Sequence, residues 1–108
     1  MNVKNTNINS TPEILKRKLG GELFVPVTIA TASFTNGVCK AGSPIGADGT
    51  VQNGASAVGI LLYDVYEQNP NGSLVKAFAV INTANAEANT GLTIDSAVKT
   101  ALPMVIFE

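Results

Sequence analysis

The sequence contains no histidine and no tryptophan, and it contains one cysteine, Cys39. Histidine is the commonest general base near neutral pH and a common metal ligand, so its absence disfavours most hydrolytic and metal-dependent mechanisms. One cysteine cannot form a disulfide within the chain, and one thiolate without histidine partners cannot build a zinc site. Cys39 follows Val38 in a β-like stretch, where we expect a small buried or edge residue.

Charged residues make up only 14% of the chain, well below the usual share of about 25%. The net charge is −1, so nucleic-acid binding that relies on overall positive charge is not expected. The chain has no apolar run of about 18 residues, and residues 1–7 lack the apolar segment of a secretory signal. We therefore expect no nucleic-acid partner and no membrane partner, and a protein that starts in a cytoplasm.

The 108 residues suffice for one domain, and charge is divided unevenly along them. Residues 1–20 carry four basic side chains and one acidic side chain, a balance of +3, whereas residues 21–108 carry three basic and seven acidic, a balance of −4. The first segment is poor in apolar residues and ends at Gly20-Gly21, which predicts a flexible basic N-terminal arm before a folded domain. Within the arm, Pro12 to Leu19 could form a short turn of helix with Thr11 as its N-cap.

The folded domain has the composition of a β protein, with apolar and β-branched segments separated by turn residues. The segment Val58 to Tyr66 is apolar through its middle, which predicts a strand buried on both faces. Asn71-Gly72 favours a type I′ hairpin turn, so the next segment, Leu74 to Asn82, is expected to return as the partner strand. Pro26 marks an edge position or a bulge in another strand. The further strand candidates are residues 22–34, 38–45 and 104–107.

A helical period occurs near the end of the chain. Apolar residues at i, i+3, i+4, i+7 and i+8 form one stripe; they are Ile94, Ala97, Val98, Ala101 and Leu102. Thr93 or Asp95 can cap its start, Pro103 limits its end, and residues 83–91 before it are small and polar, as in a loop or weak edge segment. The predicted fold is mainly β (β-rich α+β), a small sandwich or barrel-like domain with a β-hairpin and one short late helix.

Few residues offer chemistry. Asp64 and Glu67 could form a carboxylate pair, but surface charges at the end of a strand are the expected interpretation. Residues 46–50 resemble a glycine-rich or calcium loop but lack the P-loop lysine and the acidic spacing of an EF-hand, so a turn is expected. Aromatic side chains expected in the core or at an interface are Tyr63, Tyr66 and Phe78. The sequence predicts no enzymatic activity, no cofactor, no metal site and no small-molecule substrate.

The order of three motifs carries a family resemblance. Asp48-Gly49-Thr50 is followed by Ala57-Val58-Gly59-Ile60-Leu61, and the late helix and last strand, Ile94 to Phe107, come in matching order. On these residues the chain resembles the head-decoration (capsid-stabilising) proteins of tailed bacteriophages, of the lambda head-stabilising type. It also resembles the capsid-proximal domain of phage head-fibre proteins. The resemblance covers roughly residues 40–108; the sequence departs from the lambda type in having no tryptophan and a different arm.

The resemblance implies a homotrimer on the outer surface of the virion that clamps the major capsid protein, with the N-terminal arm contacting the shell. The arm residues expected to anchor or steer this contact are Ile8, Ile14, Leu15, Lys16, Arg17 and Lys18. Each arm of one trimer would make a weak contact, and the three together would give tight attachment because the first contact raises the effective concentration of the others. The alternative is the base domain of a head fibre, or an adaptor module that binds a receptor or carbohydrate.

Overall fold

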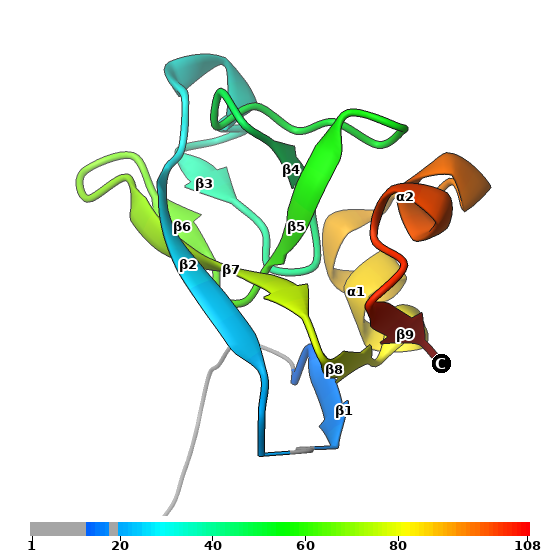
Figure 1. Ribbon diagram of the computed structural model, residues 1–108. Helices are drawn as coiled ribbons and strands as arrows, with labels where there is room; N and C mark the ends of the chain where they lie inside the picture. The colour runs from blue at the N-terminus through cyan, green and yellow to red at the C-terminus, as the bar shows by residue number, and fades with distance from the viewer. Residues whose placement is uncertain (1–12, 18–19) are drawn as a thin grey trace, which may run out of the picture.

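The computed structural model describes residues 13–17 and 20–108, and this part of the chain is mainly β (Figure 1). The β-rich α+β class predicted from the sequence is confirmed. The strands are β1 (Leu15–Arg17), β2 (Leu23–Thr28), β3 (Val38–Cys39), β4 (Pro44–Gly46), β5 (Ala57–Leu61), β6 (Val65–Tyr66), β7 (Asn71–Ala77), β8 (Ala79–Ile81) and β9 (Val105–Phe107). The helices are α1 (Thr83–Thr90) and α2 (Ser96–Ala101), with a 3-10 turn at Thr31–Ser33.

A four-stranded antiparallel sheet in the order β2-β7-β5-β4 forms the centre of the molecule. Ile60 pairs with Val75 on one face, and the next residues, Leu61 and Leu74, pair on the other. All four side chains are at most 2% exposed. The prediction of a strand buried on both faces is therefore confirmed for β5. It is wrong for the rest of Val58 to Tyr66, because β5 ends at Leu61, Val65–Tyr66 is the separate strand β6, and Tyr63 and Tyr66 are exposed.

Each face of this sheet covers its own apolar cluster. The helix-side core contains Ile60 and Val75 together with residues of both helices and of β8 and β9. The hairpin-side core contains Leu61 and Leu74 together with Ile29, Cys39, Ile45 and Val65. Both helices lie on one side of the sheet and the β3–β6 pair on the other (Figure 1). Pro26 lies in β2 at the edge of the sheet, as predicted.

The predicted hairpin has the right strands but the wrong turn. β5 and β7 pair as expected, but Asn71 and Gly72 lie inside β7 and neither has a positive φ. The tight turn that precedes β7 is closed by Asn69, whose N–H donates to the carbonyl of Tyr66 at 2.9 Å. A turn with two positive φ angles, 55° and 80°, occurs instead at Asn36-Gly37, before β3.

The predicted strand Leu74 to Asn82 is split at Phe78. The φ of Phe78 is 58°, so the chain leaves the central sheet after β7 and enters a second sheet as β8. This second sheet has the order β1-β8-β9, and β8 and β9 are parallel. A positive φ is uncommon outside glycine and marks strain for a bulky residue. The strain at Phe78 lies where the two sheets meet.

The predicted helical turn over Pro12 to Leu19 is wrong for the residues that the structure describes, because Leu15–Arg17 is a strand. Leu15 pairs with Ile81, and the N–H of Asn82 donates to the carbonyl of Ile14 at 2.7 Å. Ile14 is 2% exposed and belongs to the helix-side core. The sequence suggested that this segment has too few apolar residues to be buried. Pairing with the edge of β8 and burial of Ile14 are enough to hold it in the domain. Residues 13–17 thus pack with the domain, whereas residues 1–12 and 18–19 lie outside the described part.

Helix α1 occupies the segment that was expected to be a loop or weak edge. It has no apolar stripe, and Ala86 is its buried residue. Polar contacts fix it: the side chain of Asn82 accepts from the N–H of Asn85, and Asn85 donates to the carbonyl of Glu13. A Cβ at Gly42 would lie 2.7 Å from the Cα of Ala86, so the helix approaches the backbone closely. Helical periodicity could not reveal a helix held in this way.

Helix α2 confirms the predicted late helix. Asp95 caps it by accepting from the N–H of Ala97 at 3.0 Å, and the helix ends at Ala101 before Pro103. Of the predicted stripe, Ile94, Val98 and Leu102 are at most 5% exposed, and α2 packs against β5 and β9.

Val98→Asp places an unpaired carboxylate in the helix-side core, where Val98 is 0% exposed. We expect a loss of about 3–5 kcal/mol in the free energy of unfolding. Lys99→Ala, on the next and exposed position, is expected to stay within about 0.5 kcal/mol of wild type. Urea unfolding of the three proteins measures both; equal midpoints for Val98→Asp and wild type would contradict the packing of α2.

Candidate interaction surfaces

The predicted arm residues do not act together at one exposed site in the structure. Ile14 is buried, and Leu15 packs partly buried against the helix-side core. Lys16 and Arg17 are exposed in β1, whereas Ile8 and Lys18 lie outside the described residues. In this conformation the side chain of Ile14 is not exposed to a partner, because it is buried against the chain's own core.

The two described cations of the arm share one carboxylate. Nη2 of Arg17 donates to Oε2 of Glu108 at 2.5 Å, and Nζ of Lys16 lies 3.6 Å from Oε1. The hydrogen bond from Arg17 holds the pKa of Glu108 below its ordinary value. Such an exposed network adds little stability, but it offsets part of the positive charge that was expected to steer the arm towards an acidic shell.

An exposed apolar surface surrounds the junction of the two sheets, and we call it the junction patch. The N–H of Phe78 donates to the carbonyl of Met104 at 2.7 Å, and Leu23 is paired with Ala77, the neighbour of Phe78. The members are 44–59% exposed; they are Leu23, Phe24, Phe78, Met104 and Ile106. Large apolar side chains gathered at neighbouring backbone positions are typical of a protein contact surface.

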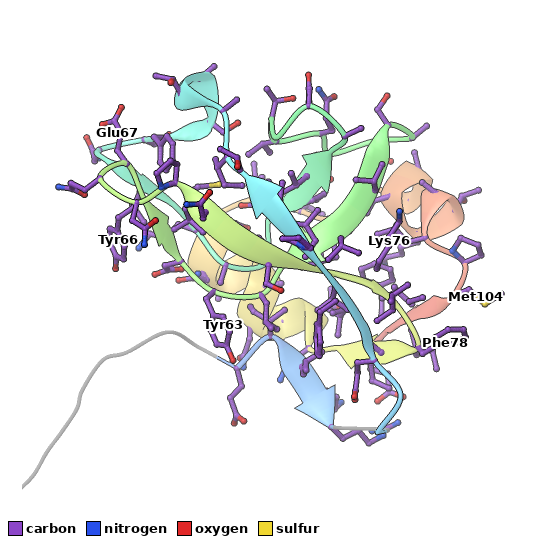
Figure 2. All side chains as sticks on the ribbon, turned by 60° about the vertical axis from the view of Figure 1, so that its left-hand side comes forward. Tyr63, Tyr66, Glu67, Lys76, Phe78 and Met104 are labelled. Carbon is purple, nitrogen blue, oxygen red and sulfur yellow. The ribbon has the colours of Figure 1, made fainter. Side chains whose placement is uncertain are left out.

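A second exposed surface, the tyrosine patch, is formed by Tyr63 and Tyr66. Their side chains are 61% and 55% exposed. Figure 2 shows both tyrosines with Glu67 on one side of the view, and Phe78 with Met104 on the other. Tyr66 belongs to β6, whose pairing with β3 fixes its position. Tyrosine is enriched where proteins meet, because it combines a rigid apolar ring with a hydrogen-bonding tip.

A cleft of about 760 Å³ lies between residues 32–40 and the end of α1. It is the place to look for a small polar ligand, since its walls carry hydroxyl and amide groups. Its polar lining residues are Ser33, Thr35, Asn36, Lys40, Ser43, Thr50, Asn89 and Thr90.

Hydrogen bonds within the chain occupy most donors of this cleft. The hydroxyls of Ser33 and Ser43 donate to the carbonyls of Gly49 and Lys40. The remaining bonded donors follow the same pattern: Thr50 donates to Asp48, Asn89 to Ala41 and Asp64, and Thr90 to Ala86. A site built to recognise a ligand keeps such groups free for it. Most of the polar side chains of the cleft therefore hold the fold together; among the described residues, the lining side chains without such a bond are Thr35, Asn36 and Lys40.

Two of the candidate acids are likewise used by the fold. Asp64 accepts from the N–H of Ala41 at 2.7 Å and from the amide of Asn89 at 3.1 Å, so it ties α1 to the loop after β3. The hydroxyl and N–H of Thr50 donate to Asp48 and hold the pKa of that carboxyl below its usual value. The turn predicted at residues 46–50 is confirmed, because the N–H of Gly49 donates to the carbonyl of Gly46.

Sequence reasoning named Tyr63, Tyr66 and Phe78 as core or interface residues but could not choose between the two. Phe78 stands in the middle of an apolar run, where periodicity predicts burial. The split between β7 and β8 exposes Phe78 instead. Met104, predicted to begin the last strand, lies in the turn before β9 and is exposed.

Searches of family models, of curated proteins and of solved structures find no match for this chain. Within residues 13–17 and 20–108, no helix is long and apolar enough to cross a membrane.

Ile14→Ala tests the role of β1 in the domain. Because Ile14 is 2% exposed, its truncation leaves a cavity in the helix-side core, and we expect a loss of about 2–4 kcal/mol in stability. Glu13→Ala is the matched control, since Glu13 contributes its carbonyl oxygen to the contact with Asn85. Chemical denaturation of both variants is the measurement; an Ile14→Ala protein as stable as the control would show that residues 13–17 are dispensable for folding.

Cys39 is buried in the hairpin-side core, and burial raises the pKa of its thiol against a smaller opposing effect of the hydrogen bond with Ser43. The neutral thiol is thus stabilised by folding up to the pKa of the unfolded chain, about 8.5, and that contribution is lost as the pH rises further. We expect stability to fall more steeply above this pH in wild type than in Cys39→Ala.

Thiol labelling gives an independent check on Cys39. A disulfide reagent at pH 8 is expected to react slowly with the folded protein and at once with the protein unfolded in guanidinium. Equal rates in the two states would mean that the thiol is accessible and that the cleft reaches it.

Proposed function

We propose that this chain is a structural virion protein that binds the outer surface of a phage capsid as a trimer and stabilises or decorates the head. The proposal starts from the resemblance of residues 40–108 to head-decoration proteins. Its motifs coincide with parts of the framework: residues 48–50 form the turn after β4, residues 57–61 are β5, and residues 94–107 span α2 and β9. The resemblance to head-decoration proteins thus concerns residues that build the fold rather than residues of a binding site.

The observation that carries the proposal is the contrast between the two kinds of surface. The polar cleft has most of its donors engaged within the chain, whereas the junction patch and the tyrosine patch present large apolar side chains to solvent. A small domain with outward apolar patches and few charges suits a part that is covered by other proteins. The same contrast ranks the receptor- or carbohydrate-binding adaptor second, because a glycan site requires free polar donors and the described cleft leaves only those of Thr35, Asn36 and Lys40.

Fewer residues are free to attach the protein to the capsid than the predicted arm of residues 1–20 contains. Ile14 and Leu15 pack within the domain, and Lys16 and Arg17 share Glu108. Residues 1–12, which include Ile8, stay the proposed attachment segment, and Lys18 stays a proposed steering charge. The partner is the major capsid protein; the proposal includes no enzymatic activity, cofactor or nucleic acid.

Co-sedimentation with empty expanded capsids, assembled from the major capsid protein of the same genome, tests the proposal. We expect saturable binding of the full chain. Deletion of residues 2–12, which keeps Ile14 and β1, is expected to lower binding by at least about tenfold through loss of multivalency while the melting temperature stays within a few degrees. Deletion of residues 2–19 also removes Ile14 and is expected to lower the melting temperature.

Three outcomes would contradict this account. No binding of the full chain at high micromolar concentration would refute capsid decoration. Undiminished binding after deletion of residues 2–12 would show that the folded domain carries attachment. Retention on a glycan array without binding to capsids would favour the adaptor module.

A further inference from the structure

Three asparagines of the chain are each followed by glycine: Asn36, Asn53 and Asn71. Glycine has no side chain to shield its nitrogen, so in this dipeptide the backbone nitrogen attacks the asparagine side chain more easily than in others. The attack requires a rotation of the asparagine backbone, an accessible glycine nitrogen and a side-chain amide that other contacts do not hold. The sequence makes the three sites equivalent, whereas the fold gives them three different environments.

The side-chain amide of Asn53 is held at both of its polar atoms. Its Oδ1 accepts from the N–H of Asp95 at 2.9 Å, and its Nδ2 donates to the carbonyl of Thr93 at 2.8 Å. The nitrogen of the next residue is engaged as well, since the N–H of Gly54 donates to the carbonyl of Gln52 at 2.9 Å. Both reacting groups of this site are thus restrained in the folded protein.

Asn71 is restrained by its place in β7. It pairs with Thr28 of β2, and its side chain accepts from the hydroxyl of Thr28 at 3.1 Å and donates to the side chain of Asn69 at 3.2 Å. A Cβ at Gly72 would lie 2.6 Å from Cγ2 of Val65, so the backbone is closely packed there. Rotation of the Asn71 backbone would require this end of β7 to leave the sheet.

Asn36 is the asparagine of the three whose reacting groups the fold leaves unrestrained. It is exposed in the two-residue turn between Thr35 and Val38. In the part of the chain that the structure describes, neither the Asn36 side chain nor the N–H of Gly37 forms a hydrogen bond. A Cβ at Gly37 would meet no atom within 4 Å, so the space around it is open. A surface turn of this kind opens at a lower free-energy cost than a strand within a sheet.

We propose that Asn36-Gly37 is a deamidation site, at which the folded protein converts asparagine into aspartate and isoaspartate. The nitrogen of Gly37 forms a bond to Cγ of Asn36, and the side-chain amide leaves as ammonia with the proton that the Gly37 nitrogen gives up. Water then opens the cyclic imide. Cleavage of the bond to Cγ gives aspartate, and cleavage of the bond to the backbone carbonyl carbon gives isoaspartate. The reaction consumes water alone, and the inference does not depend on the proposed function.

The two products differ in what they do to the turn. Aspartate tolerates a positive φ, so it suits the φ of 55° at position 36 and the two hydrogen bonds that join Thr35 to Val38. Isoaspartate lengthens the main chain by one atom, which a two-residue turn cannot absorb without losing those bonds. Since the carbonyl of Gly37 also accepts from the N–H of Glu67 at 3.0 Å, the isoaspartate form is expected to loosen the adjoining β3–β6 pair.

Either product also changes the charge of the cleft that Asn36 lines. A neutral amide becomes a carboxylate, and the cleft contains the free cation of Lys40. The net charge of the chain falls from −1 by one unit at each conversion, so converted and unconverted protein are separable by ion exchange.

The experiment incubates the full chain at mildly alkaline pH, folded and unfolded in guanidinium, and follows by peptide mass spectrometry the conversion of each asparagine to the acid. In the folded protein we expect Asn36 to convert at least about tenfold faster than Asn53 or Asn71, because local opening is easiest at the turn. In guanidinium the three rates are expected to become similar. Conversion of Asn36 in the folded protein that is no faster than that of the other two would overturn the proposal.

A variant and a product analysis test the cyclic route. Gly37→Asn keeps a residue type that adopts the positive φ of 80° and shields the backbone nitrogen, so conversion of Asn36 is expected to slow several-fold. Lys99→Ser, an exposed control in α2, is expected to keep the wild-type rate. Isoaspartate arises from the imide and not from direct hydrolysis of the side chain, and an isoaspartate-specific methyltransferase detects it. An unchanged rate in Gly37→Asn, or a product without isoaspartate, would overturn the proposal.

Discussion

The pairing of β5 with β7 is the interaction on which the rest of this structure depends. Ile60 and Val75 face the helices, and Leu61 and Leu74 face the β3–β6 pair, so four neighbouring side chains serve two cores. A domain of this size has little apolar surface to bury. When both faces of a strand pair are covered, successive residues are all buried, in one core or the other. The helices, β8 and β9 pack on one face, and the Cys39 region packs on the other.

Polar side chains complete what the apolar cores leave open. Three asparagines attach α1: Asn82 caps it, Asn85 reaches the carbonyl of Glu13, and Asn89 bridges Ala41 and Asp64. Hydrogen bonds of this kind make a modest net contribution each, but an unpaired partner in a buried seam is costly. Many polar side chains of the fold thus form hydrogen bonds within the chain, whereas the exposed patches are apolar.

The strained junction at Phe78 connects this architecture to the proposed function. Two sheets built from one apolar run must separate somewhere, and the separation occurs at a residue whose backbone turns its ring towards solvent. The side chain that a continuous strand would have buried or paired becomes part of an exposed patch with Met104. A surface of this kind would suit the proposed function, in which other proteins cover part of the domain.

The sequence alone determined the β-rich class, the double-sided burial of β5, the edge position of Pro26 and the capped helix α2, because each depends on local periodicity or on the chemistry of one residue. It did not determine that Leu15–Arg17 would be a strand, that α1 would exist without an apolar stripe, or that Asn71-Gly72 would lie inside β7. Those depend on partners far along the chain: the edge of β8, the close approach of Gly42, and the register with β2 and β5. The candidate surfaces belong to the second group, since whether Phe78, Tyr63 and Tyr66 are core or interface depends on how the sheets divide.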